Sequence, residues 1–428
     1  MLCMKSELDL FADRPVQASI LKTEEVSYKP IASLDNTTVI EFTPIAHGDT
    51  YRDLSSIYLR LQVKLLKDNQ DTIHTDAKSG VCNNILHSLI RQCSVYLNGK
   101  PVAQTESNYN YRSYIENLLN YGVESAQTHL EGTGWIIDKG NIDSIVDKEN
   151  PGLDARKKLF GKSGTVELIG KLHADMFNQS KLLLSNVDLR IVLSLEKPEF
   201  YVMEEDGGKS YVKITDATLY MNHCTISPSI LLAHEKVLQT KNCIYPYKRV
   251  EVLSHTIPAN SKTLHLDNVV TGRLPNFLVF GMVDNEAFVG KRSKNPYNFQ
   301  HYNISEFCLS VNGVQVPSQP LQFDFQKSPS ISTHGYYTLF KGTNIQHFDR
   351  SHQITKQFFE NGCFLLAFDL TADQSNDLSA CGNLLNQGVL RIHGRFSNEL
   401  PKTISCIIYL EYSGLIEIDK TRTVYTRY

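Results

Sequence analysis

The segment Cys93-Ser94-Val95-Tyr96-Leu97-Asn98-Gly99-Lys100-Pro101-Val102 places Asn-Gly between two short apolar runs. This dipeptide is the strongest local signal for a tight β-hairpin, because a type I′ turn needs a positive φ at both central residues. A second copy follows in Phe307-Cys308-Leu309-Ser310-Val311-Asn312-Gly313-Val314-Gln315-Val316-Pro317. The two turns lie 312 − 98 = 214 residues apart, which is half of the 428-residue chain. This spacing predicts a duplicated β domain.

Length and composition agree with two globular domains. A chain of 428 residues suits two domains of about 200 residues each, and 41% hydrophobic with 21% charged residues is a globular composition. The formal net charge of −3 gives no basic field that would recruit nucleic acid. No apolar run approaches the roughly 20 residues of a membrane span, and the start shows no signal-peptide core. The nine scattered cysteines, without C-x-x-C spacing, favour a reducing compartment.

The first half alternates apolar and polar residues in several short segments, which predicts strands with one buried face. These segments are 39–42, 59–65, 187–195 and 212–224. Residues 105–122 change to helical spacing, with Ser107 as the expected N-cap and Gly122 as the expected C′ residue. Residues 204–209 predict a second hairpin turn. Residues 123–165, which include the only tryptophan, are weakly patterned and predict a functional or interface loop.

The second half repeats the order of the first. Segment 260–266 parallels 36–42, and 277–283 is an apolar strand where the first half has 57–65. The Asn312-Gly313 turn leads into a tyrosine-rich segment, 335–340, and then into a short capped helix expected at 349–362. At the end of the chain, 388–393 parallels 186–191, and 404–418 parallels 214–227. The shared order suggests an ancient duplication.

Many short strands at regular spacing with brief helices describe an all-β protein built from antiparallel sandwiches. A unit of roughly 190 residues with about eight strands has the size of a jelly roll, so two in tandem predict a double jelly roll. The expected boundaries are an N-terminal arm at 1–35, a first jelly roll at 36–226, a connector helix and linker at 227–245, and a second jelly roll at 246–428. Ser227-Pro228 opens the connector as N-cap and N1.

The sequence predicts no catalytic, cofactor-binding or metal site. Gly161-Lys162-Ser163 looks like the end of a P-loop, but Arg156 stands where the first glycine is needed. It is not a G-x-S-x-G nucleophile elbow either. His347 and His352 have the wrong spacing for one helix face, and Asp369 follows an apolar strand as a turn or cap residue does. The 21 tyrosines and 19 phenylalanines, without clusters of Lys and Arg, favour packing over base stacking.

Several segments in order along the chain resemble the major capsid proteins of Polinton (Maverick) elements and adintoviruses. The resemblance begins with Lys5-Ser6-Glu7-Leu8-Asp9-Leu10-Phe11 and ends near Leu415-Ile416-Glu417-Ile418-Asp419. Between them, the matching segments are 40–42, 86–89, 95–99, 111–116, 168–177, 187–191, 368–371 and 388–391. Matches in order over nearly the whole chain are more specific than any single motif.

The resemblance implies a structural role and no enzyme activity. It implies a double jelly-roll subunit whose homotrimer has a pseudo-six-fold outline and tiles an icosahedral shell beside neighbouring capsomers. Its implied partners are penton and minor capsid proteins, and its implied place is the virion capsid, made and assembled inside the host cell. The candidate outer loops are 66–80, 123–165 and 284–303. Because relatives also occur in animal genomes, a host-domesticated copy of the capsid gene is an alternative.

Two other classes compete with a capsid subunit. A two-domain jelly-roll module that binds carbohydrate or another ligand predicts a secretory signal, disulfides or clustered acidic calcium ligands. A cupin-like enzyme predicts an H-x-H motif with a further carboxylate and histidine inside one barrel. The sequence has no H-x-H motif and no evident secretory signal. The oligomeric state separates these hypotheses, since a capsid subunit has to form trimers.

Overall fold

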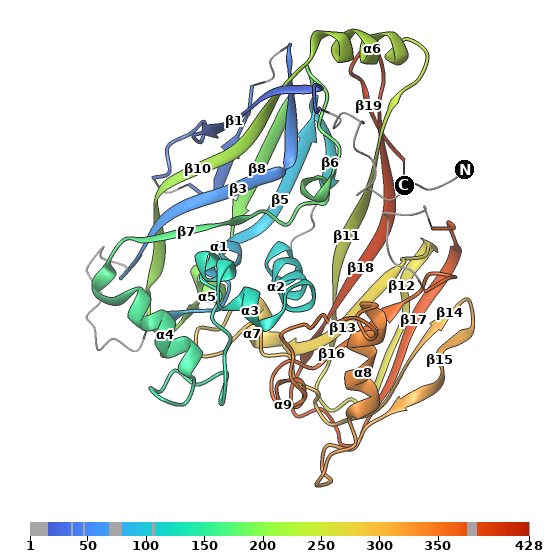
Figure 1. Ribbon diagram of the computed structural model, residues 1–428. Coiled ribbons are helices and arrows are strands. Elements are labelled where there is room, and N and C mark those ends of the chain that lie inside the picture. The colour runs from blue at the N-terminus through green and yellow to red at the C-terminus, as the bar shows by residue number, and fades with distance from the viewer. Residues whose placement is uncertain are drawn as a thin grey trace, which may run out of the picture.

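The computed structural model describes residues 16–35, 37–45, 48–67, 79–104, 108–374 and 383–427. Figure 1 shows two β units, one made from the blue to green half of the chain and the other from the yellow to red half. The long strands β11 (Cys243–Ile257) and β18 (Ile404–Ile418) belong to the second unit and run beside each other on its side toward the first unit. Helix α6 (Pro228–Leu238) lies at one end and joins the halves, as the Ser227-Pro228 pair predicts.

The first half contains two four-stranded antiparallel sheets. One sheet has the order β1-β10-β3-β7, with bounds Ile20–Tyr28, Tyr211–Ile226, Thr50–Leu66 and Val166–Lys171. The other has the order β2-β8-β5-β6, with bounds Val39–Phe42, Leu189–Leu195, Ile90–Leu97 and Lys100–Gln104. A small pair, β4 (Gly80–Val81) and β9 (Val202–Met203), lies outside them.

The second half repeats this strand order. One sheet runs β11-β18-β13-β16, with β13 at Phe277–Asp284 and β16 at Leu365–Asp369, and β19 (Val424–Arg427) also pairs with β18. The other runs β12-β17-β14-β15, with bounds Thr263–Arg273, Gln387–Phe396, Ile304–Val311 and Val314–Gln322. Each sheet therefore has its counterpart in the first half. Two tandem eight-stranded sandwiches, the predicted double jelly roll, are confirmed.

Both Asn-Gly turns are type I′ hairpins, as predicted. The φ angles are 47° and 75° at Asn98 and Gly99, and 53° and 80° at Asn312 and Gly313. The asparagine side chain does more than tolerate the turn. In the first copy Asn98 Oδ1 accepts a hydrogen bond from Asp188 N (2.7 Å), and in the second Asn312 Oδ1 accepts one from Val389 N (2.9 Å). The first turn thus binds the residue just before β8, and the second turn binds a residue of the equivalent strand, β17.

The apolar periodicity corresponds to the core. In β3, Leu59, Leu61 and Val63 are at most 1% exposed, while the alternating polar residues reach the surface. Strand β13 is buried along its whole length, which explains its continuous apolar run. Strand β1 was not predicted, because most of its residues are exposed and its centre is charged. Charged residues on an edge strand discourage pairing with other chains.

Three details of the sequence prediction need correction. Residues 20–28, expected in the arm 1–35, form β1 and pair with β10, so the first sandwich begins at this strand; residues 1–15 lie outside the described part. The second sandwich likewise begins with β11, within the predicted linker 227–245. Residues 204–209 form a turn but no hairpin, because β9 pairs with β4 while β10 pairs with β3 and β1.

Short helices fill the connections. Helix α2 (Tyr109–Asn120) follows the first hairpin, with Asn108 at its N-cap position; Ser107, the predicted cap, lies outside the described residues. The expected loop 123–165 contains four short helices separated by irregular segments, and the predicted helix 349–362 is the shorter α9 (Lys356–Glu360), capped by Thr355. The remaining helices are α1 (Ile85–Ser88), α3 (Val123–Ala126), η2 (His129–Thr133), α4 (Pro151–Leu159), η3 (Gly161–Ser163), η4 (Asp175–Asn178), α5 (Pro198–Tyr201), α7 (Asn285–Val289) and α8 (Thr333–Gly342).

Candidate functional site: the junction between the two sandwiches

The Gly161-Lys162-Ser163 segment is a surface turn. It forms η3 between helix α4 and strand β7, which is the reverse of the strand–loop–helix order that a P-loop requires. The Ser163 hydroxyl donates to the carbonyl of Leu65 at 2.6 Å and is therefore used to close the turn. The segment therefore lacks the arrangement of a phosphate-binding loop, in agreement with the missing first glycine.

The other residues considered for chemistry have structural contacts. His352 is 5% exposed and packs against Phe340 with ring centroids 4.3 Å apart, whereas His347 is exposed. Asp369 Oδ1 accepts hydrogen bonds from the backbone and hydroxyl of Thr371, so it is the predicted turn residue. Among the described residues, no group of three or more His, Cys, Asp or Glu side chains is arranged to hold a metal ion.

The most elaborate arrangement of side chains lies where the two sandwiches meet. Helix α2, from the first half, presents Tyr111 and Tyr114 to the connection between β13 and β14 of the second. Tyr114 stacks on Tyr297 with ring centroids 4.0 Å apart, and Tyr111 OH donates to Pro296 O at 3.0 Å. Ser88 and Tyr297 add a hydroxyl–hydroxyl contact of 2.6 Å. Aromatic stacking and satisfied hydroxyls together fix the orientation of the two halves.

A buried ion network reinforces the same junction. Arg112 Nε donates to Glu116 Oε1 at 2.8 Å, and its Nη1 donates to Asp175 Oδ1 at 2.7 Å. All three side chains are at least 90% buried. The second half joins the network, because Asp175 Oδ1 accepts from Val250 N (3.2 Å), and the Tyr409 hydroxyl lies 3.2 Å from Glu116 Oε1 and 2.8 Å from Glu411 Oε1. The network therefore includes groups from both sandwiches.

The charges in this network are set by opposing effects. Burial alone would raise the pKa of Glu116, but the Arg112 charge and the hydrogen bond from His173 hold that pKa well below its ordinary value. For Asp175 burial prevails over the contact with Arg112, and its pKa is raised. Burial also lowers the pKa of the nearby His87 well below its ordinary value. These groups resemble a catalytic cluster in composition, but Glu116 and Asp175 contact the second half, and His87 packs within the first half against Tyr109 and His173.

The segment 123–165 supplies a second bridge. Trp135 is 1% exposed, and its Nε1 donates to Gln353 Oε1 in the second half at 2.7 Å. Asp138 accepts from Arg156 at 2.5 Å through Oδ1 and from Asn295 Nδ2 at 2.8 Å through Oδ2. The segment therefore joins the two halves of the chain, and it contains short helices that the loop prediction missed.

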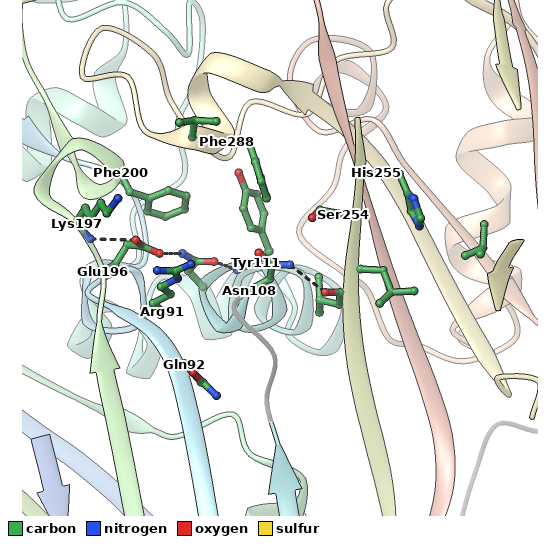
Figure 2. A pocket seen from close by; sticks show the side chains of 15 residues that line it. Arg91, Gln92, Asn108, Tyr111, Glu196, Lys197, Phe200, Ser254, His255 and Phe288 are labelled. Atoms are coloured by element: carbon green, nitrogen blue, oxygen red, sulfur yellow. Dashed lines mark hydrogen bonds between the residues drawn. The ribbon is translucent and has the colours of Figure 1, made fainter. Parts of the chain in front are cut away.

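An open groove of about 890 Å³ runs along another side of the junction. Figure 2 shows Arg91, Glu196 and Lys197 on one wall and His255 on the other, with Tyr111 between them. The Glu196 carboxylate accepts from Asn110 Nδ2 at 3.1 Å and from Lys197 N at 3.0 Å. Burial raises the pKa of Glu196 above its ordinary value. The walls come from both sandwiches, so the groove is a consequence of how they dock.

Comparisons with known proteins identify the fold. No protein-family model matches the chain. An uncharacterized protein of Caenorhabditis elegans is 24% identical over 347 residues, covering 79% of this chain and 80% of that protein. A chain in the structure of the Sputnik virophage is similar with TM-score 0.65 and 14% identity, covering 100% of this chain and 92% of the other.

The mavirus major capsid protein is similar with TM-score 0.54 and 12% identity, covering 99% of this chain and 93% of the other. At these identities the likeness concerns the fold, and it extends over both sandwiches. The chain therefore has a double jelly-roll fold of the kind found in viral major capsid proteins. The sequence predicted this fold from its duplicated hairpin, but it gave no signal for the polar junction beyond the i,i+4 spacing of Arg112 and Glu116.

Proposed function

We propose that this chain is a major capsid protein whose homotrimers form the capsomers of an icosahedral virus shell. The observation that carries the proposal is the repeated strand order of two sandwiches in one chain, together with a likeness to capsid structures over its full length. Three such chains supply six similar sandwiches, and a ring of six similar units gives a trimer a pseudo-six-fold outline. Such an outline suits the near-hexagonal packing of a closed shell.

The rigid junction supports the same role. The Tyr114–Tyr297 stack and the Arg112 network fix the angle between the two sandwiches of one chain. A shell subunit needs a fixed angle, because a small error in one subunit is repeated at every contact of the assembly. The polar network is satisfied on both sides of the junction, and fully satisfied buried networks rigidify the packing around them.

The partners and the origin follow from this proposal. Its partners are other copies of the chain, neighbouring capsomers, and penton and minor capsid proteins, and its place is the virion capsid after synthesis inside the host cell. With a formal net charge of −3, the chain leaves DNA condensation to a separate basic protein. We assign the chain to Polinton elements or adintoviruses. The similar protein in an animal, Caenorhabditis elegans, supports this origin, because relatives of these capsid proteins also occur in animal genomes. In the described residues no helix is both long and apolar enough for a bilayer span.

The oligomeric state of the purified full chain tests the proposal. Size-exclusion chromatography with light scattering should give a mass of about 146 kDa, three times the 48.5 kDa of one chain, or larger particles. A two-domain ligand-binding module would instead elute as a monomer. A stable monomer at micromolar concentration contradicts the capsid function.

A further inference from the structure

Two histidines face each other on the outer surface of the second sandwich. His265 in β12 and His393 in β17 are paired across the antiparallel ladder, and their Nδ1 atoms lie 3.1 Å apart. The strands β12, β17 and β14 are side by side in Figure 1. Their neighbours Leu264 and Ile392 are fully buried, so the histidines point away from the core, where His265 is exposed and His393 half-buried.

The separation of the two nitrogens matches the bite of a chelated metal ion. Zinc–imidazole bonds are about 2.0–2.1 Å long, which places two nitrogen ligands about 2.9 Å apart at a right angle and about 3.4 Å apart at the tetrahedral angle. The observed 3.1 Å lies between these limits. We propose that His265 and His393 bind one divalent transition-metal ion through their Nδ1 atoms. Among the described residues no set of three ligands is preformed, so water completes the coordination.

Metal binding requires a change of tautomer and a rotation of the rings, because the two Nδ1 positions that point at each other in the hydrogen bond have to converge on one ion. In the metal-free pair one Nδ1–H donates to the other Nδ1, since both atoms cannot carry a proton in a hydrogen bond between them. On binding, that proton leaves Nδ1 for solvent and the same ring takes a proton at Nε2, so both Nδ1 lone pairs reach the metal. Imidazole ligands favour Cu²⁺, Ni²⁺ and Zn²⁺ over Mg²⁺ and Ca²⁺, which prefer oxygen.

The surrounding charges nearly cancel. Arg391 and Arg395 are exposed on the same strand at positions two residues before and after His393. Their positive charges oppose a bound cation. Asp267 follows His265 by two residues, and Glu306 is paired with Arg395 across the ladder, which offsets the two arginines. Cys308 is the other ladder partner of His393. It is not part of the proposed ligand set.

Calorimetric titration of the metal-free full chain with NiCl₂ tests the proposal. The wild-type protein should bind one equivalent per chain, and His265→Ala and His393→Ala should each weaken binding by about tenfold or more, because each removes one of two chelating ligands. Exposed His347→Ala and Cys308→Ser should leave the affinity unchanged. Circular dichroism checks that each variant is folded.

The proposal is overturned if the wild-type chain shows no saturable binding, if either histidine variant binds like the wild type, or if Cys308→Ser weakens binding. Electron paramagnetic resonance of the Cu²⁺-loaded chain gives an independent readout. A hyperfine pattern from two equatorial nitrogens supports the His265–His393 pair, and a pattern from one nitrogen contradicts it. Neither result depends on trimer formation, so this test stands apart from that of the capsid function.

Discussion

Tyr114 and Tyr297 stack with their ring planes 1° apart and their centroids 4.0 Å apart, although one belongs to the first sandwich and the other to the second. Both side chains are fully buried. The stack lies beside Trp135, whose ring centroid is 5.1 Å from that of Tyr114. The two sandwiches therefore share a continuous core across their junction, which makes the pair a single rigid body.

Removing one ring of this stack should loosen the junction. Tyr114→Ala should lower the free energy of unfolding by about 3–5 kcal/mol, since it leaves a large cavity among buried aromatic rings. Denaturant titration followed by Trp135 fluorescence measures the change. Tyr337→Ala is the matched control, because Tyr337 is 49% exposed and its loss should cost less than about 1 kcal/mol. Equal costs for the two variants would contradict a shared core.

Removing the arginine of the buried ion network should destabilise the fold, whereas removing an exposed arginine should not. Arg112→Leu leaves Glu116 and Asp175 buried without their cation and should destabilise the chain by about 3–5 kcal/mol. The control Arg190→Leu removes the exposed pair with Glu41 and should cost at most about 1 kcal/mol. Thermal unfolding of both variants compares the costs. A near-neutral Arg112→Leu would mean that the network does not hold the halves together.

His352 should make the chain sensitive to mild acid. Burial lowers its pKa from 6.5 to about 4, so the folded state binds its proton less readily than the unfolded state. Its contribution to stability is complete above pH 6.5 and is lost as the pH falls from 6.5 toward 4. His301, whose pKa burial also lowers to about 4, acts in the same direction.

The variant His352→Asn isolates this effect, because its side chain can still accept from Ile354 N but does not titrate. Between pH 7 and pH 4.5 the variant should lose about 2 kcal/mol less stability than the wild type. His347→Asn, at an exposed position, should lose as much as the wild type. Parallel pH profiles for His352→Asn and the wild type would show that His352 does not titrate in this window.

The second hairpin tests the duplicated turn. Replacing Asn312-Gly313 by Val-Val puts β-branched residues at φ angles of 53° and 80° and removes the hydrogen bond to Val389 N. Each left-handed position costs about 1–2 kcal/mol for such a residue, so the double variant should be destabilised by about 2–4 kcal/mol. The exposed Gln315→Val serves as control. Normal stability of the Val-Val variant would refute the hairpin.

Sequence patterns that span only a few residues predicted the turns and strands of the fold. The two type I′ turns and the alternating strands were readable because turn chemistry and period-2 burial act over a few residues. Strand β1 was missed because it is a mostly exposed edge strand, in which charged residues interrupt the half-buried apolar positions Ile20, Val26 and Tyr28. Helix α4 was missed although Asn150 accepts from Leu153 N and Pro151 opens it, which is a readable start signal.

The junction could not be predicted in the same way. Arg112 and Glu116 are one turn apart on α2, but Asp175 and Tyr409 reach them from 63 and 293 residues away. Such contacts depend on how the two sandwiches dock, which no local pattern specifies. The His265–His393 pair likewise needs the register of β12 against β17. Sequence reasoning therefore reached the architecture, and the structure supplied the contacts.

The symmetry of the purified assembly tests the central claim most directly. Electron microscopy of the full chain, with class averages viewed down the particle axis, should show three-fold particles whose outline has six similar lobes, two from each chain. The chain is expressed without any other capsid protein, so that the assembly can be attributed to this chain alone. Monomers, or assemblies without a three-fold axis, would contradict the proposal that three chains with two sandwiches each form a ring of six similar sandwiches.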